Sequence, residues 1–361
     1  MSVRARAPGK LVLMGEYAVL EGAPAVVMAV DRHVAVEVGA AKGRRCELYA
    51  PDVHDAVLTF AVDAGGGVKW DDAAHAMDFA LVVAVIGALA QSGLLPSAPW
   101  RADLDSATFF DHRDGRAIKL GLGSSAALTA ALASALVANA GRADILAERG
   151  AWLERLLAIH RRFQRGRGSG LDVAAAVYGG EIVFRNRGTT VDVERCAWPA
   201  AVERIYVWSG RSASTRAFLE QLTQWRDGEP GAYRRCMDRI GAASEAGVAA
   251  LRGGAADALL RAVERTTDAL RALDRASKIR IFSAEHDAIA DAVTAAGGVY
   301  KPCGAGGGDL GLALASGEAS VRRVTDAVRA AGYRTVELRT DGSGLTVAPL
   351  ADGMEAEVET P

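Results

Sequence analysis

The sequence predicts an α+β protein in which strands and helices mix in both halves of the chain. Segments that alternate apolar and polar residues with the period of a strand, at 33–40 and 46–50, occur beside an alanine-rich run of helical length at 125–141. No internal repeat, low-complexity linker or long charge run interrupts this mixture. Because each half carries both kinds of element, we expect two α+β layers that meet face to face.

In the first half, the opening apolar segment is broken by turns at Gly15 and at 21–24, and the two strands named above follow. The helix at 125–141 follows a glycine-rich loop and ends near Gly141, because glycine favours the left-handed cap of a helix. The other elements expected here are a buried helix over 73–91, a helix over about 147–163, a short helix after the loop at 166–170, and a strand at 181–185.

The second half begins after a polar, irregular stretch at 185–205, and we place the domain boundary there, giving domains 1–195 and 196–361. A strand pair is expected around the turn "DGSG" at 341–344. The remaining expected elements are a strand at 204–210, a helix at 213–225, two helices in 231–276 interrupted at Gly253 and Gly254, a helix at 283–296, two strands flanking a glycine loop in 299–316, and a helix at 317–331.

Composition excludes several classes of protein. The 361 residues carry a formal net charge of −2, which provides no general field for nucleic acid or an anionic membrane. Four scattered cysteines without a CxxC pair argue against a zinc site or a disulfide framework and favour a reducing cytosol. The most apolar stretch holds only about a dozen strongly apolar residues before Gln91, which is short for a membrane span. We therefore expect a cytoplasmic protein with small-molecule ligands and no nucleic-acid or membrane partner.

The stretch "KLGLGSSAALTAAL" at 119–132 sets glycines and serines directly before a helix. Serine before an apolar run is an ordinary helix start, but exposed N–H groups at a helix N-terminus also bind anions. The stretch is neither a GxxxxGK[ST] phosphate loop nor a GxGxxG dinucleotide fingerprint. Local sequence leaves a capped turn and a phosphate cradle both open.

Two further glycine-rich loops and one acidic residue have the same ambiguity. Lys10 follows Pro8 and Gly9 in "APGKLVLMGEY", where it is either a solvated lysine or a ligand for an anion. The run "CGAGGGDLGLAL" is either a loose hairpin loop or a place where the backbone closely approaches a ligand. Asp172 follows "GSGL" at a helix start, so it is equally a first-turn acid or a carboxylate that orients or deprotonates a substrate.

Three stretches together resemble the signature motifs of the GHMP kinases, a superfamily that includes galactokinase, homoserine kinase, mevalonate kinase and phosphomevalonate kinase. They are "APGKLVLMGEYAVLEGAPAVVMAVDR", "KLGLGSSAALTAAL" and "KPCGAGGGDLGLAL", in the family's order and over essentially the whole chain. The resemblance implies the GHMP kinase fold, with an N-terminal α/β domain like that of ribosomal protein S5 and a C-terminal ferredoxin-like α+β domain.

The resemblance also implies where ATP and Mg²⁺ bind. Asp172 matches the family's catalytic aspartate, Lys10 matches the lysine that stabilises the reacting groups, and Lys119 would add positive charge near the phosphates. Either of the two serines of the ATP loop could contact the metal through its hydroxyl group, and the sequence does not decide between them. The residues that match the ATP loop are Gly121, Leu122, Gly123, Ser124, Ser125 and Ala126.

Within the family, the flanks "GEYAVLEGAPAVVMAVDR", "GSGLDVAAAVYGG" and "VWSGRSASTRAF" look most like the phosphomevalonate kinases. This implies ATP-dependent phosphorylation of 5-phosphomevalonate to the diphosphate in the mevalonate pathway of isoprenoid biosynthesis. Arg165 and Arg167 suit a substrate that already carries a phosphate, because guanidinium groups pair well with phosphate. A basic loop in water remains the alternative interpretation. The implied substrate-binding residues are Arg165, Arg167, Ser169, Gly170, Ser212, Ser214, Thr215, Gly304, Ala305 and Gly306.

Mevalonate kinase is the nearest alternative. That branch places a metal-binding glutamate on the helix before its SG[IV]D loop, where this chain has "LAIHRRFQRGRGSGLD" with His160, Arg161, Arg162 and Gln164. The difference argues against a mevalonate kinase and leaves Mg²⁺ with fewer protein ligands. Another GHMP small-molecule kinase and a non-catalytic sensor on the same fold stay open, because a fold does not fix a function. The expected oligomeric state is a monomer or a homodimer.

Overall fold

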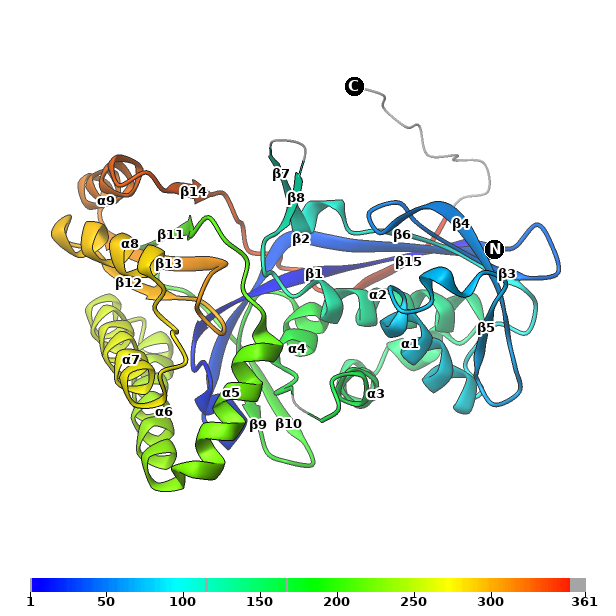
Figure 1. Cartoon of the computed structure of the whole chain (residues 1–361), viewed down its shortest axis with the longest axis horizontal. Coiled ribbons are helices and arrows are strands. Elements are labelled where there is room, and N and C mark those ends of the chain that lie inside the picture. Colours follow the sequence, from blue (N-terminus) through cyan, green and yellow to red (C-terminus); the bar gives the residue numbers. More distant parts are fainter. Residues whose placement is uncertain (1, 114–115, 167, 351–361) are drawn as a thin grey trace.

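Two long antiparallel strands, β1 (Ser2–Met14) and β2 (Ala25–Ala40), run through the middle of the molecule and connect its two halves (Figure 1). The computed structural model of the chain describes residues 2–113, 116–166 and 168–350. The register of the β1–β2 pair shifts between Pro8 and Gly9. Lys10 follows this shift directly, so the irregularity lies at the place where the sequence predicts a functional lysine.

The first half is built on a nine-stranded mixed sheet in the order β10-β9-β2-β6-β3-β4-β5, and β1 pairs with both β2 and β15. Strand β3 runs parallel to β6, whereas the other pairs are antiparallel. A separate hairpin joins β7 and β8. The bounds are Cys46–Ala50 for β3, His54–Val62 for β4, Val68–Trp70 for β5, Trp100–Asp105 for β6, Phe110–Arg113 for β7, Arg116–Lys119 for β8, Glu181–Asn186 for β9, Val191–Cys196 for β10 and Thr346–Leu350 for β15.

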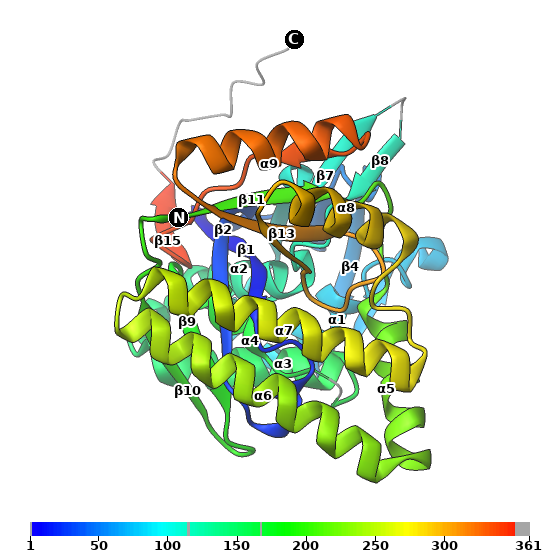
Figure 2. The ribbon, with the colours of Figure 1, turned by 90° about the vertical axis from the view of Figure 1, so that its left-hand side faces the viewer.

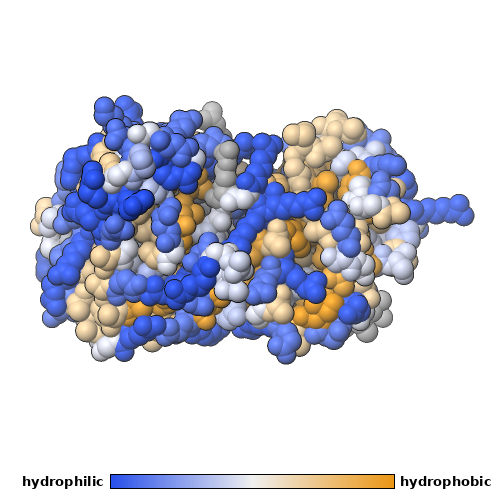
Figure 3. Space-filling model, turned by 90° about the horizontal axis from the view of Figure 1, so that it is seen from below, coloured by the Kyte–Doolittle hydropathy of each residue, from blue (hydrophilic) through white to orange (hydrophobic). Residues whose placement is uncertain are grey.

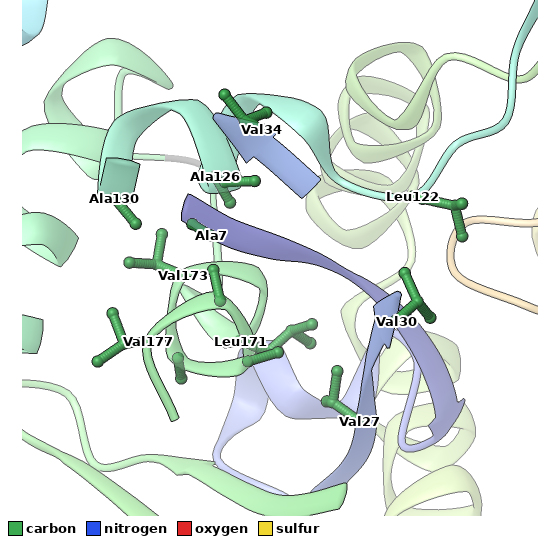
Figure 4. Packing of buried hydrophobic residues seen from close by; sticks show 14 of the residues in the cluster. Ala7, Val27, Val30, Val34, Leu122, Ala126, Ala130, Leu171, Val173 and Val177 are labelled. Atoms are coloured by element: carbon green, nitrogen blue, oxygen red, sulfur yellow. The ribbon is translucent and has the colours of Figure 1, made fainter. Parts of the chain in front are cut away.

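Helices α1 (Ala80–Gln91), α2 (Ser124–Asn139), α3 (Arg149–Phe163) and α4 (Leu171–Tyr178) cover one face of this sheet (Figure 1). Figure 4 shows small residues of α2 and branched residues of α4 packed toward β1 and β2. Alanine lets the helices approach the strands closely, and this holds the N-termini of α2 and α4 beside β1.

The second half contains a four-stranded antiparallel sheet in the order β12-β13-β11-β14. Helices α8 and α9 pack on one face of this sheet, and the long helices α6 and α7 lie side by side on the other side (Figure 2). The bounds are Val202–Trp208 for β11, Thr215–Gly228 for α5, Pro230–Arg252 for α6, Ala256–Ser277 for α7, Ala284–Ala295 for α8, Val299–Pro302 for β12, Leu310–Ser316 for β13, Glu318–Ala330 for α9 and Arg334–Val336 for β14.

The two halves share one apolar core. Leu310, Leu312 and Leu314 of β13 belong to the same buried cluster as the side chains of β1, β2 and α2. The C-terminal strand β15 also returns to pair with β1, although its residues lie in the range expected for the second domain. The domain boundary between residues 195 and 196 itself stays a prediction.

Three sequence predictions about local structure are wrong. The helix expected over 73–91 begins only at Ala80, because the Asp72 side chain accepts a hydrogen bond from Ala74 N–H and caps a separate short 3-10 turn. The stretch 185–205 is not irregular, because β10 lies within it and pairs with β9. The strands around 341–344 do not pair with each other: β14 pairs with β11, whereas β15 pairs with β1.

Among the described residues, no helix combines the length and the apolar character that crossing a membrane requires. Seen from below, the surface is mostly hydrophilic, with smaller hydrophobic patches between the charged areas (Figure 3). The cytoplasmic location stays a prediction.

Candidate active site

A cleft with about 710 Å³ of empty space, part of it open to solvent, lies where the two halves meet. Its walls come from β1 and the turn that follows it, from the end of α3, from the start of α4, from α5 and from the loop after β12. Its lining residues are Lys10, Val12, Glu16, Tyr17, Val19, Leu20, His160, Gln164, Gly168, Ser169, Gly170, Leu171, Asp172, Thr215, Leu219, Gly304 and Ala305.

Lys10 and Asp172 form the polar centre of this cleft. Lys10 Nζ lies 4.0 Å from Asp172 Oδ2, and the two side chains are 13% and 33% exposed. Lys10 projects from β1, and Asp172 is in the first turn of α4, which starts after Gly170 at a φ of 90°. The structure therefore brings together two residues that the sequence places 162 positions apart (172 − 10). A cation and a carboxylate at this separation can act on one bound phosphoryl group.

The glycine-serine loop, defined here as residues 121–126, lies against β1 at Lys10. Lys10 N–H donates to the Leu122 carbonyl at 2.8 Å, and the Leu122 side chain is fully buried. Gly121 and Gly123 have positive φ angles of 73° and 78°, which glycine adopts without strain. No side chain caps the start of α2, so the first N–H groups of this helix have no side-chain acceptor. Such an N-terminus can bind an anion such as phosphate.

The two serines of this loop differ in their surroundings. Ser125 Oγ lies 3.4 Å from Nε2 of His160, a buried histidine at the end of α3. Burial lowers the pKa of His160, although the Asp172 carboxylate opposes this shift, so the surroundings favour the neutral ring. Which of Ser125 Oγ and His160 Nε2 donates the hydrogen bond depends on the tautomer of that ring. In the part of the chain that the structure describes, no such neighbour is found for the Ser124 hydroxyl, and the choice of metal-binding serine stays open.

The oxygen atoms beside the cleft, at the starts of α2 and α4, fit a hard cation held mainly by a nucleotide. Within residues 2–113, 116–166 and 168–350, no cluster of three or more histidine, cysteine or acidic side chains could hold a metal ion. Mg²⁺ keeps several waters and is commonly bound through substrate phosphates and one or two protein oxygens. The hydroxyl groups of Ser124 and Ser125 and the Asp172 carboxylate are oxygens of this kind, so the site suits Mg²⁺ that arrives with ATP.

Asp309 directly follows the glycine loop, defined here as residues 304–308, and lies against the glycine-serine loop. A Cβ atom on Gly121 would lie 2.4 Å from the Asp309 carboxylate. Asp309 Oδ1 accepts the Ala213 N–H at 3.1 Å. Burial raises the pKa of Asp309 to about 6, against the opposing effects of that N–H and of the positive charges of Lys10 and Lys119. This carboxylate therefore joins both glycine loops and the segment before α5.

Lys119 lies at the end of β8 beside this junction. Its carbonyl accepts a hydrogen bond from Ser212 Oγ at 3.0 Å. Desolvation by the surrounding protein lowers the pKa of Lys119, and the charge of Asp309 opposes that shift. The predicted catalytic role of Lys119 is untested, but its side chain is close enough to Asp309 for their charges to interact.

The glycine loop at 304–308 needs residues without a Cβ atom, because its backbone lies very close to neighbouring segments. A Cβ atom on Gly306 would lie 2.5 Å from the Ile281 carbonyl, and one on Gly307 would lie 2.2 Å from the Phe218 ring. The buried His286 supports the loop, since its Nε2 lies 2.9 Å from the Gly308 carbonyl. The loop is therefore closely packed, which removes the alternative of a loose hairpin.

The structure separates the predicted substrate-binding residues into two groups. Ser169, Gly170, Thr215, Gly304 and Ala305 line the cleft, whereas Ser212, Ser214, Gly306 and Arg165 do not. The Ser214 hydroxyl caps α5 by accepting the Ala217 N–H.

The predicted phosphate contact of the two arginines, Arg165 and Arg167, is untested. Arg165 is exposed in a turn after α3 with a φ of 55°. Arg167 lies outside the described residues. The binding roles of all these residues stay predictions.

Four residues of the site were not predicted from the sequence: Glu16, Tyr17, His160 and Asp309. Glu16 and Tyr17 stand in the motif "GEY", and Asp309 ends the run "GGGD", so their motifs were recognised but their side chains were not. His160 has no spacing that would mark it.

Known proteins share both sequence and fold with this chain. The GHMP kinases N terminal domain matches residues 114–180, a range that contains the glycine-serine loop and Asp172. A phosphomevalonate kinase from Streptomyces sp. (strain CL190) is 31% identical, and the alignment covers 97% of this chain and 96% of that protein. The chain belongs to the GHMP kinases. The α+β fold implied by the resemblance is that of a GHMP kinase, and ATP binding at residues 121–126 stays a prediction.

Solved structures of GHMP kinases share the whole fold. The Streptococcus pneumoniae phosphomevalonate kinase in complex with phosphomevalonate and AMPPNP has a TM-score of 0.72 at 18% identity, over 94% of this chain and 99% of that one. The L. major mevalonate kinase in complex with R-mevalonate has a TM-score of 0.63 at 18% identity, over 96% of each chain. At these identities the comparison with solved structures supports the fold alone, and this GHMP kinase is a phosphotransferase by family.

Proposed function

We propose that this GHMP kinase transfers the γ-phosphoryl group of ATP, bound with Mg²⁺, to 5-phosphomevalonate and produces the diphosphate. The proposal rests on the 31% identity to a phosphomevalonate kinase over nearly the full length of both chains. It is supported by a cleft in which Lys10 and Asp172 face each other beside the uncapped start of α2.

In this proposal, different groups of the chain bind the nucleotide and neutralise charge on the transferred phosphoryl group. The N–H groups at the start of α2 hold the nucleotide phosphates, and Lys10 stabilises charge on the transferred group. The acceptor is a phosphate oxygen that is already largely ionised near neutral pH, so it needs no strong base. Asp172 then mainly orients Lys10 and the acceptor. Mg²⁺ supplies charge neutralisation on the phosphates when it is bound with ATP.

A second candidate function is phosphorylation of an alcohol such as mevalonate. Among the described residues that line the cleft, Lys10 is the one lysine or arginine, while Glu16 and Asp172 are acidic. An acceptor that already carries a phosphate would be expected to meet more than one cation. For an alcohol acceptor, Asp172 would be the base that receives the hydroxyl proton.

A coupled assay of ADP release, with ATP, Mg²⁺ and either mevalonate or 5-phosphomevalonate, tests the two candidates directly. Turnover with 5-phosphomevalonate alone supports the proposal. Turnover with mevalonate alone would replace it with the second candidate. ADP release at background with both acceptors would favour another GHMP substrate or a sensor that binds ATP without transfer.

A further inference from the structure

Glu16 and Lys301 form an ion pair that is closed off from solvent and joins the two halves of the molecule. Lys301 Nζ contacts Glu16 Oε1, and the two side chains are 0% and 2% exposed. Burial acts to lower the pKa of Lys301, but the Glu16 carboxylate more than offsets this, so the pKa is raised and the lysine stays charged. An ion pair in such a position needs its remaining hydrogen-bonding capacity satisfied.

The turn that carries Glu16 is held in an unusual conformation. Gly15 has a φ of 89°, and a Cβ atom there would lie 2.3 Å from the Pro24 carbonyl. Tyr17 has a φ of 62°, which is uncommon for a bulky residue, and its hydroxyl group donates to the Ala305 carbonyl. Strained backbone of this kind persists where the surrounding structure fixes it, and here it directs Glu16 toward Lys301 and the cleft.

Only one of the two carboxylate oxygens of Glu16 is used. Oε2 is buried and has no hydrogen-bond partner among residues 2–113, 116–166 and 168–350, although Glu16 lines the cleft. A buried acceptor that carries charge and lacks a donor is destabilising, and native structures seldom leave one without a reason. A ligand in the cleft that carries a hydrogen-bond donor would satisfy it.

The ligand group that donates this hydrogen bond must not be anionic, because the Glu16 carboxylate repels phosphate and carboxylate groups. None of residues 121–126 lines the cleft, so we assign the cleft to the acceptor rather than to the nucleotide phosphates. An alcohol group on the carbon chain of the acceptor meets both conditions.

We infer that Glu16 Oε2 accepts a hydrogen bond from a hydroxyl group on the carbon chain of the acceptor, so that Glu16 determines specificity. The inference rests on the proposed function, since 5-phosphomevalonate carries such an alcohol at its third carbon, away from the reacting phosphate. A site built to bind a hydroxyl group rejects the analogue that lacks it, because its own buried acceptor is then left unpaired.

Calorimetric binding of 5-phosphomevalonate and of its 3-deoxy analogue to the full-length protein tests this inference. The wild-type protein should bind the hydroxylated compound about 10- to 100-fold more tightly. In the double variant Glu16→Met/Lys301→Met, which replaces the ion pair with apolar groups, the preference should fall to about threefold or less. Glu16→Gln with Lys301 kept, which retains a weaker acceptor, should give an intermediate preference.

The matched control removes an exposed ion pair from the half of the molecule that contains Lys301. Arg322 and Glu318 pair on the surface of α9, and Glu318→Met/Arg322→Met should keep the wild-type preference. Equal binding of the two compounds by the wild-type protein, or an unchanged preference in the Glu16 variants, would overturn the inference. A binding preference without turnover of 5-phosphomevalonate would count against the proposed function alone, and turnover with equal binding would count against the role of Glu16 alone.

Discussion

The Lys10 amino group and the Asp172 carboxylate face each other at 4.0 Å within the cleft. This separation is short enough for strong attraction but longer than a hydrogen bond of 2.7–3.2 Å. Lys10 therefore keeps its N–H donors available for phosphate oxygens while Asp172 fixes its position. Under the proposed function, Lys10 is a cation of the cleft that neutralises the reacting phosphate groups.

Lys10→Met should lower kcat/KM for 5-phosphomevalonate by about 100-fold or more, because charge that stabilises the transition state is lost. Asp172→Asn should cost no more than this, since an ionised phosphate acceptor needs little help from a base. Steady-state kinetics of the two variants check the order. Full activity of Lys10→Met beside an inactive Asp172→Asn would show that proton removal, not positive charge, limits the reaction.

Gly121→Ala should raise the KM for ATP and lower stability, because the new Cβ atom would lie 2.4 Å from the Asp309 carboxylate. Gly141→Ala is the matched control, since Gly141 has a similar φ of 77° but no neighbour within 4 Å of the new atom. Both variants should lose about 1 kcal/mol from backbone strain. Only Gly121→Ala should show the kinetic defect. Equal KM values for ATP in the two variants would show that the close contact between Gly121 and Asp309 does not affect ATP binding.

Asp309→Asn should stabilise the protein at neutral pH. The folded-state pKa of Asp309 is raised to about 6 from an ordinary value of 3.8, so folding favours the protonated acid. The stability associated with that proton is present below about pH 4 and is lost as pH rises through 6. The variant keeps an oxygen for the Ala213 N–H and should exceed the wild-type protein by up to about 3 kcal/mol at pH 7.

Urea unfolding at a series of pH values measures this difference. It should be small near pH 4, grow up to pH 6 and then stay constant. A difference that shrinks as pH rises would mean that the Asp309 carboxylate is stabilised, not penalised, by its surroundings.

Lys301→Met should destabilise the fold by about 3–5 kcal/mol, because it leaves the buried Glu16 carboxylate without its partner. Arg322→Met, which breaks the exposed pair with Glu318 on α9, should cost no more than about 0.5 kcal/mol. Thermal and urea unfolding of both single variants provide the comparison. Similar losses in the two variants would show that burial adds nothing to the Glu16–Lys301 pair.

The helices, most strands and the three glycine-rich loops could be predicted from the sequence, because periodicity, glycines and motif order are local signals. Side-chain partners across the two halves could not. Glu16 and Lys301 are 285 residues apart, and nothing near either residue indicates the other. The pairing of β15 with β1 depends likewise on the folded sheet, although "DGSG" reads locally as a hairpin turn.

The candidate site shows the same division. Lys10, Asp172 and the glycine-serine loop were found through their motifs, whereas Asp309 takes its importance from contact with Gly121, which only the fold creates. Arg165 lies in an exposed turn and does not line the cleft, so its predicted binding role stays a prediction that the fold alone does not support.

The most direct test of the central claim is the identity of the phosphorylated product. Phosphorus NMR of the purified protein with ATP, Mg²⁺ and 5-phosphomevalonate should show two coupled resonances of a new diphosphate ester, formed at the rate of ADP release. A phosphomonoester that forms from mevalonate, with 5-phosphomevalonate left unchanged, would contradict the proposal and assign the cleft to an alcohol acceptor.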